Sequence, residues 1–152
     1  DAGLSRGLGD VYKRQGLTLI QKVLLAEDGI GEKTPLCQEV MTHFSNDVDQ
    51  IVSWSKNALP RDYGKFSPMI FRHAAQADSL AISLLQQTAA DVEMFILALH
   101  KKGANRICLM GSIAERMYDW LSPPVQQWIV EPQFDAIEGA LMFAGKPEHN
   151  LY

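Results

Sequence analysis

The chain has 152 residues, of which 47% are apolar and 21% charged, and its formal net charge is -4. These values are ordinary for a soluble globular chain and exclude a broadly basic protein that binds nucleic acid or anionic lipid. Two cysteines, Cys37 and Cys108, are too few for a disulfide framework, which favours a reducing cytoplasm.

The first fifteen residues differ from the rest of the chain. The string DAGLSRGLGDVYKRQ lacks the apolar stretch of a signal peptide, and it contains three glycines without convincing helical periodicity. Apolar residues recur at helical spacing only after this string. We therefore expect the fold to begin at Gly16.

The segment that follows is predicted to be helical. A threonine followed by Pro35 opens a helix, Pro60 closes one, and Ser67 and Asp78 are expected caps. The expected helices cover residues 17–25, 35–43, 47–59, a segment that starts at residue 67, and 78–103. Residues 80–99 are the most apolar window, but glutamines and carboxylates interrupt it, so it indicates a buried helix rather than a membrane span.

The pattern changes after residue 106. Residues 107–110 form a short apolar run bounded by glycines, which is typical of a strand buried on both faces. Ser112 is the expected cap of a helix that ends before Pro123, residues 128–130 are a second strand candidate, and residues 132–145 are the last expected helix. This order predicts two parallel strands joined by a helical crossover, in an α/β fold that is mostly helical.

The chain contains no complete catalytic or metal-binding motif. Its four histidines are scattered and never pair at metal-ligand spacing, and the sequence has no nucleophile elbow. The pair Gly145-Lys146 is not followed by the serine or threonine that a P-loop requires. We therefore assign no catalytic residue and no metal ligand.

The most informative signal for a binding site is the turn after the first expected strand. A strand that runs into Gly111-Ser112 and then into a helix exposes backbone amides at a place where nucleotides bind in open α/β sheets. Gly111 has no Cβ, so a flat ring can approach the main chain there. Most such turns are simple connections, so taken alone this pattern leaves both interpretations open.

Long, non-repetitive stretches carry a resemblance that is more specific than any short motif. They are GLTLIQKVLLAEDGI, ALPRDYGKFSP, QTAADVEMFILALHKKGANRICLMGSIAERM, DWLSPPVQQWIVEPQ and DAIEGALMFAGKPEHNLY. Over residues 16–152 the chain resembles the C-terminal portion of the bacterial glucosamine kinases, which belong to the BadF/BadG/BcrA/BcrD-type ATPase family of the actin-like, sugar kinase and heat-shock ATPase superfamily.

The resemblance implies a fragment of a ribonuclease-H-like (actin-like ATPase) C-terminal domain with two short parallel strands and about six helices. The implied helical insert spans about residues 34–103, and the last strand–helix units span about residues 104–145. Where the family carries a Gly-Ser-Gly-type turn, this chain has the string GDVYKRQ, which resembles translated adapter sequence. Residues 1–15 are therefore expected to be an unmatched leader, an artefact of a junction.

The resemblance also implies a function. The glucosamine kinases transfer the γ-phosphate of ATP to the 6-hydroxyl of glucosamine, with Mg²⁺, between two domains that close on the substrates. The phosphate-binding glycine hairpin and the aspartate base belong to the other half of the family's fold, and this sequence contains neither. We therefore expect a cytoplasmic fragment with part of an adenosine site and no activity alone, without nucleic acid or a membrane as partner, and with homodimerisation left open.

Four residues are implied as ATP contacts. The family's adenosine motif falls on residues 110–113, where Gly111 and Ser112 face the adenine and ribose, and Arg116 follows one helical turn later beside the nucleotide. Ser53, in the helical insert, aligns with a hydroxyl residue that forms the other wall of the adenine pocket.

Other interpretations stay open. The chain could be part of another amino-sugar kinase, or it could be a helical interaction module that binds a protein and no nucleotide. It could also belong to the dehydratase-activating ATPases of the same wider family, which hold an iron–sulfur cluster between subunits with cysteine thiolates. Cys37 and Cys108 show no such arrangement.

Overall fold

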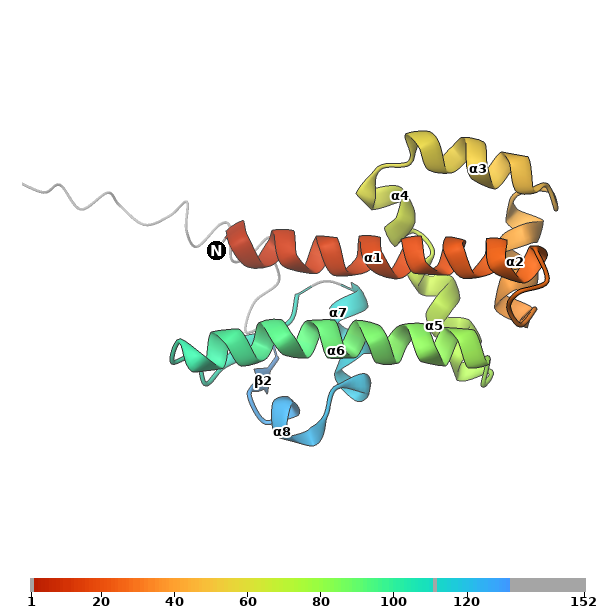
Figure 1. The fold of residues 1–152 in the computed structure, drawn as a ribbon. Coiled ribbons are helices and arrows are strands. Elements are labelled where there is room, and N and C mark those ends of the chain that lie inside the picture. Colours follow the sequence, from red (N-terminus) through yellow and green to blue (C-terminus); the bar gives the residue numbers. More distant parts are fainter. Residues whose placement is uncertain (1, 111, 132–152) are drawn as a thin grey trace, which may run out of the picture.

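The structure is a computed structural model that describes residues 2–110 and 112–131. Its elements are α1 (Ala2–Glu27), α2 (Pro35–His43), α3 (Val48–Asn57), α4 (Pro60–Gly64), α5 (Ser67–Ala75), α6 (Ser79–Lys101), β1 (Ile107–Cys108), α7 (Ser112–Met117), the 3-10 helix η1 (Tyr118–Trp120), α8 (Pro123–Gln126) and β2 (Ile129–Val130). Figure 1 shows the long helices α1 and α6 side by side and antiparallel, with α2 to α5 at one end of the pair. The predicted helix 132–145 lies outside the described residues.

Helix α1 begins at Ala2 rather than after Gly16, so the expected boundary at Gly16 is not a boundary of secondary structure. The reason is packing, because Val11 is 2% exposed and Gln15 is 4% exposed. These two residues continue, at four-residue spacing, the buried face that includes Leu19. The stripe that contacts α4 and α6 therefore extends toward the N-terminus. The origin of residues 1–15 stays a prediction.

Two prolines were expected to end helices, and α3 and η1 do end before them, at Asn57 and Trp120. Each proline also begins a short helix that was not expected. Pro60 is the first residue of α4, and Pro123 is the first residue of α8. Proline is favoured at the first helical position because that residue's N–H has no intrahelical partner and its φ is already helical. The expected helix at Pro35 is confirmed, with Thr34 as its cap accepting a hydrogen bond from the Cys37 N–H.

The helix around Pro68 also begins differently from the expectation. Ser67 is the first residue of α5 and does not cap it, since its hydroxyl donates a 2.7 Å hydrogen bond to Gln15 Oε1 in α1. Gln15 Nε2 donates to Thr88 Oγ1 at 2.8 Å, so this amide links α1 to both α5 and α6. A buried amide with both of its groups paired ties the three helices together.

Asp78 caps α6 as predicted and has a second role. Its Oδ1 accepts a hydrogen bond from the Ala81 N–H at 2.9 Å, and its Oδ2 accepts one from the Leu36 N–H of α2 at 2.8 Å. The side chain is 5% exposed, so these two donors replace the water that the carboxylate has lost. Asp78 therefore accepts a hydrogen bond from a backbone N–H in the first turn of each of two helices, α6 and α2.

Aromatic side chains form the core of the region α2 to α5. Trp54 of α3 lies 5.0 Å from Tyr63 and 5.4 Å from Phe44, measured between ring centroids, and both pairs are edge-on. Phe66 lies 5.7 Å from Trp54 and completes the group. Such edge-to-face contacts add to the burial of apolar area, so α3 is fixed to α4 and α5 although it has only one fully buried residue, Ile51.

The predicted pair of parallel strands is confirmed. Ile107 pairs with Ile129, and Cys108 pairs with Val130. The expectation that the first strand is buried on both faces was wrong, because Ile107 is buried whereas Cys108 is exposed.

Helix α6 is the central helix of the fold. By length and composition it could cross a membrane, and 44% of its most apolar window is buried inside the structure. Eight of its residues are buried. It contacts α1, α5, η1 and α8. The prediction of a buried helix is thereby confirmed.

Candidate functional site

The expected nucleotide turn lies at the carboxyl end of β1. Leu109 is buried after the strand, Met110 is 54% exposed, and α7 begins at Ser112. Gly111 lies outside the described residues, so its expected approach to a ring stays a prediction. The strand–turn–helix order around these residues is the one that the sequence predicted.

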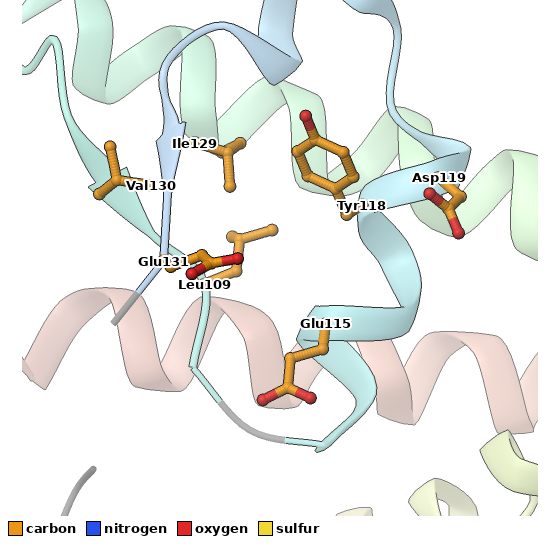
Figure 2. Close-up of a pocket in the computed structure, with 7 residues that line it drawn as sticks. All are labelled: Leu109, Glu115, Tyr118, Asp119, Ile129, Val130 and Glu131. Carbon is orange, nitrogen blue, oxygen red and sulfur yellow. The ribbon is translucent and has the colours of Figure 1, made fainter. Parts of the chain in front are cut away.

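A pocket of about 410 Å³ opens between the strands and the helices α7 and η1. It is lined by Leu109, Glu115, Tyr118, Asp119, Ile129, Val130 and Glu131. Figure 2 shows Ile129 and Glu131 on the strand side, Tyr118 and Glu115 on the facing side, and Leu109 between them. Its volume is within the range of small-molecule sites, which is about 300–1,000 Å³.

The chemistry of this lining suits a nucleoside better than a phosphate. Leu109 and Ile129 offer an apolar surface to a flat ring, and the phenol of Tyr118 lies beside them. Glu115 and Glu131 can accept hydrogen bonds from amino and hydroxyl groups. Among the described residues of the lining none is basic, so a triphosphate would be repelled.

Arg116 projects from α7 next to the acidic lining residue Glu115. Its side chain is exposed, and its Cζ lies 6.0 Å from the ring centroid of Phe71 in α5. This cation–π contact connects the helical insert to the helix that follows the turn. Arg116 is adjacent in sequence to a residue that lines the pocket, but it does not line the pocket itself, and its guanidinium lies over the ring of Phe71.

Ser53 is exposed on α3. Figure 1 shows α3 and α7 on opposite sides of α1, so the structure does not bring Ser53 together with Arg116 or with the turn. Phe71, in α5, does contact α7.

The strands beside the pocket are fixed by contacts between loops. The Ile107 N–H donates to the Trp128 carbonyl at 2.8 Å, and the indole of Trp128 stacks on His100 with the ring centroids 3.8 Å apart. His100 Nδ1 donates to the Ala104 carbonyl at 3.0 Å, which closes the end of α6. On the other side, Glu93 of α6 accepts a hydrogen bond from the Ser122 N–H, ahead of α8.

The residues present do not form a metal site. Within residues 2–110 and 112–131, no group of three His, Cys, Asp or Glu side chains is arranged to hold a metal ion. The carboxylates around the pocket therefore do not converge on one point. The Mg²⁺ that the resemblance implies has no ligands assigned in this chain, and no step is derived through it.

Comparison with known proteins decides the family. Residues 12–144 match the model of the BadF/BadG/BcrA/BcrD ATPase family, which is most of the chain. The chain belongs to the BadF/BadG/BcrA/BcrD ATPase family. Family membership agrees with the strand–turn–helix order, and it supports the predicted α/β fold with mostly helical content.

Two similar proteins are informative. The glucosamine kinase GspK of Vibrio cholerae is 76% identical over 137 residues, which are 90% of this chain and 47% of that protein. A crystal structure of a Chromobacterium violaceum protein named as an N-acetylglucosamine kinase superposes with a TM-score of 0.77 at 28% identity. That match covers 86% of this chain and 46% of the other chain. The chain thus spans about half the length of the relatives that it matches.

Sequence reasoning missed most of the residues that line the pocket. Tyr118 was placed inside a regular helix, whereas it begins the 3-10 turn that forms one wall. Glu131 directly follows the second strand, and polar residues at the carboxyl ends of parallel strands are a signal that could have indicated it. No sequence pattern indicated Phe71, because its contact with Arg116 joins two helices that are distant in sequence.

Proposed function

We propose that this chain is the C-terminal part of a cytoplasmic glucosamine kinase and that it supplies the adenosine side of the ATP site. The observation that carries the proposal is the 76% identity to a protein named glucosamine kinase. The pocket supports it, because an apolar surface with hydrogen-bond acceptors lies beside the turn of the expected adenosine motif. The acceptor is proposed to be glucosamine, phosphorylated at its 6-hydroxyl with Mg²⁺ and ATP.

The contacts follow from the chemistry of the side chains. The adenine and ribose are proposed to lie at the turn 110–113, with amino and hydroxyl groups directed at Glu115 and Glu131. The phosphates are proposed to extend away from this acidic lining, with Arg116 as the basic residue beside the nucleotide. Phosphoryl transfer depends on positioning and on neutralising charge, so these contacts would orient ATP without performing the transfer.

The chain alone is proposed to be inactive. The sequence has no Asp-Gly-Gly-Gly-Thr-type hairpin for the phosphates, and the aspartate that the resemblance implies as the base belongs to the other half of the family's fold. Both parts would come from the other half of the fold.

Two measurements test this function. In calorimetry, the chain is expected to bind ATP and adenosine competitively, but not inorganic phosphate. Failure of adenosine to compete would contradict an adenosine site.

The second measurement is a coupled assay of ADP release with glucosamine. We expect no turnover by the chain alone, and turnover when it is mixed with the separately produced N-terminal half of the Vibrio cholerae kinase. The matched control is the same mixture made with the Arg116→Ala chain, for which the KM for ATP is expected to be higher. Turnover by the unmixed chain would show that the proposal of inactivity is wrong.

A further inference from the structure

The contact between α5 and α7 joins the aromatic ring of Phe71 to the charged side chain of Arg116. Phe71 is half-buried and packs against the core, and the guanidinium of Arg116 lies over its ring at 6.0 Å. In the part of the chain that the structure describes, no carboxylate forms an ion pair with Arg116. The ring is therefore the group that restrains this guanidinium.

The ring itself is held by contacts on both sides of its helix. Ile70, its neighbour in α5, is completely buried, and α5 packs along α6. On the other side, Arg72 donates a 2.6 Å hydrogen bond to Glu39 of α2, and His73 is bound to the same carboxylate. Phe71 is thus attached to a helix that is fixed by apolar and polar contacts.

An exposed arginine has many rotamers, and ordering it on binding a ligand costs entropy. A guanidinium that rests on an aromatic face has lost part of this freedom already. Its N–H groups lie in its plane and remain available to a ligand, since the ring occupies only one face. A nucleotide that binds beside α7 would then contact a guanidinium whose position is already restricted before binding.

We propose that Phe71 is a positioning residue of the nucleotide site, and that its ring holds the Arg116 guanidinium ready for the nucleotide. The proposal rests on the proposed function in one respect, namely that Arg116 lies beside bound ATP. It assigns a role in nucleotide binding to α5, whereas Ser53, the insert residue that the resemblance implies, belongs to α3, and Figure 1 shows α3 and α7 on opposite sides of α1.

The test compares aromatic and aliphatic replacements at one position. Phe71→Leu keeps an apolar side chain but removes the π face, and it is expected to weaken ATP binding about two- to fivefold in calorimetry. Phe71→Tyr keeps the π face and is expected to bind ATP like the unmodified chain. The thermal transition of each variant is recorded as well, so that a loss of folding is recognised.

A double-mutant cycle separates positioning from a general effect on the fold. In the Arg116→Ala background, Phe71→Leu is expected to change ATP binding no further. A second measurement needs no nucleotide: the NMR signal of the Arg116 Nε–Hε group should show a more mobile side chain in Phe71→Leu than in Phe71→Tyr.

The outcomes distinguish this proposal from the proposed function. If Arg116→Ala weakens ATP binding but Phe71→Leu does not, the positioning role is wrong and the nucleotide site stands. If Phe71→Leu weakens binding equally in both backgrounds, the ring acts through the fold and the proposal is wrong. If the chain binds no ATP, or Arg116→Ala has no effect, the proposed place of Arg116 in the site is wrong. Equal mobility of Arg116 in the two Phe71 variants would overturn the positioning role independently of ATP.

Discussion

At the scale of single residues, the carboxylate of Glu39 connects α2 to α5. Arg72 Nη2 donates to Glu39 Oε1 at 2.6 Å, and His73 Nε2 donates to Glu39 Oε2 at 2.5 Å. These hydrogen bonds, that of Arg72 first, lower the pKa of Glu39 below its ordinary value of 4.5. A carboxyl group whose pKa is lower in the folded state stabilises that state above its ordinary pKa, and this contribution is lost as the pH falls through the folded-state pKa.

We therefore predict that Glu39→Gln lowers the free energy of unfolding at pH 7 by about 0.5–1 kcal/mol, the range of partly exposed ion pairs. The difference between the variant and the unmodified chain should disappear in acid, where Glu39 is protonated. Urea unfolding at a series of pH values measures this, with Asp28→Asn at an exposed site as the control. A difference that persists at low pH would show that the hydrogen bonds to Glu39 do not depend on its charge.

A second prediction concerns the phenol of Tyr12. Its hydroxyl is buried without a hydrogen-bond partner in the described part of the chain, and burial raises its pKa from 10.0 to about 12. The unfolded chain ionises at the lower value, so the folded state should lose stability as the pH rises from 10 to 12. Tyr12→Phe should abolish this loss and be at least as stable at pH 7, because it removes an unpaired buried hydroxyl.

The measurement is the thermal transition at neutral and at alkaline pH. Tyr118→Phe serves as the control, because Tyr118 is 41% exposed. If Tyr12→Phe and the unmodified chain lose stability equally above pH 10, burial of the Tyr12 phenol is not the cause.

At the scale of elements, the close approach of α1 and α4 depends on a glycine. A Cβ added at Gly16 would lie 2.5 Å from the Tyr63 carbonyl oxygen and 2.8 Å from the Tyr63 Cβ, whereas real contacts are longer. The neighbour is backbone, which cannot move without moving α4. The two helices therefore meet at a distance that only glycine permits.

We predict that Gly16→Ala destabilises the fold by about 1–3 kcal/mol, the usual cost of overpacking. The matched control is Gly9→Ala in the same helix, where an added Cβ meets nothing within 4 Å. That change should stabilise the chain by up to about 1 kcal/mol, because alanine has the higher helix propensity. Denaturant unfolding of both variants is the measurement, and a stable Gly16→Ala chain would show that α4 can move away from α1.

The elements also show what can be read from sequence. Caps are local, so Thr34 and Asp78 were correctly placed by the identity of one residue and the periodicity that follows it. The helix ends before Pro60 and Pro123 were predicted, but the short helices that begin at these prolines were missed, because a proline that follows one helix can also begin the next. The extension of α1 ahead of Gly16 depends on tertiary burial and lies beyond local propensity.

At the scale of the whole molecule, the sheet is small for a chain that belongs to an α/β family. In the described residues it has two strands, β1 and β2, with Cys108 and Met110 exposed. Two-stranded parallel pairs are marginal, and an unpaired strand edge is a template for association. We predict that the isolated chain associates as its concentration rises.

Sedimentation velocity over a wide range of concentration measures this association, and a thermal melt accompanies it. The N-terminal half of the Vibrio cholerae kinase provides the control, since it should suppress association when added. A monomer at all concentrations with one sharp cooperative transition would contradict the prediction.

The candidate site was predictable only in part, and the limit lies at this scale. Long stretches of residues 16–152 were enough to indicate the family, and the position of the turn followed from them. The contact of Phe71 with Arg116 and the place of α3 relative to α7 depend on how the helices cross, which no local pattern encodes. The lining of the pocket likewise comes from three separate segments of the chain, residues 109, 115–119 and 129–131.

The double cap at Asp78 has a consequence for the way this architecture can vary. The hydrogen bond from the Leu36 N–H joins the start of α2 to the residue that precedes α6. The segment α2 to α5 therefore begins and ends at the same place beside the pair α1 and α6. A short loop could span that gap, and related chains could gain or lose the excursion without changing the path of the remaining backbone. In this chain, deletion of the segment α2 to α5 would remove Tyr63 and Ile70 from the core, and it would remove the Phe71 ring that contacts Arg116. The path of the backbone therefore permits the deletion, whereas the contacts of this segment oppose it.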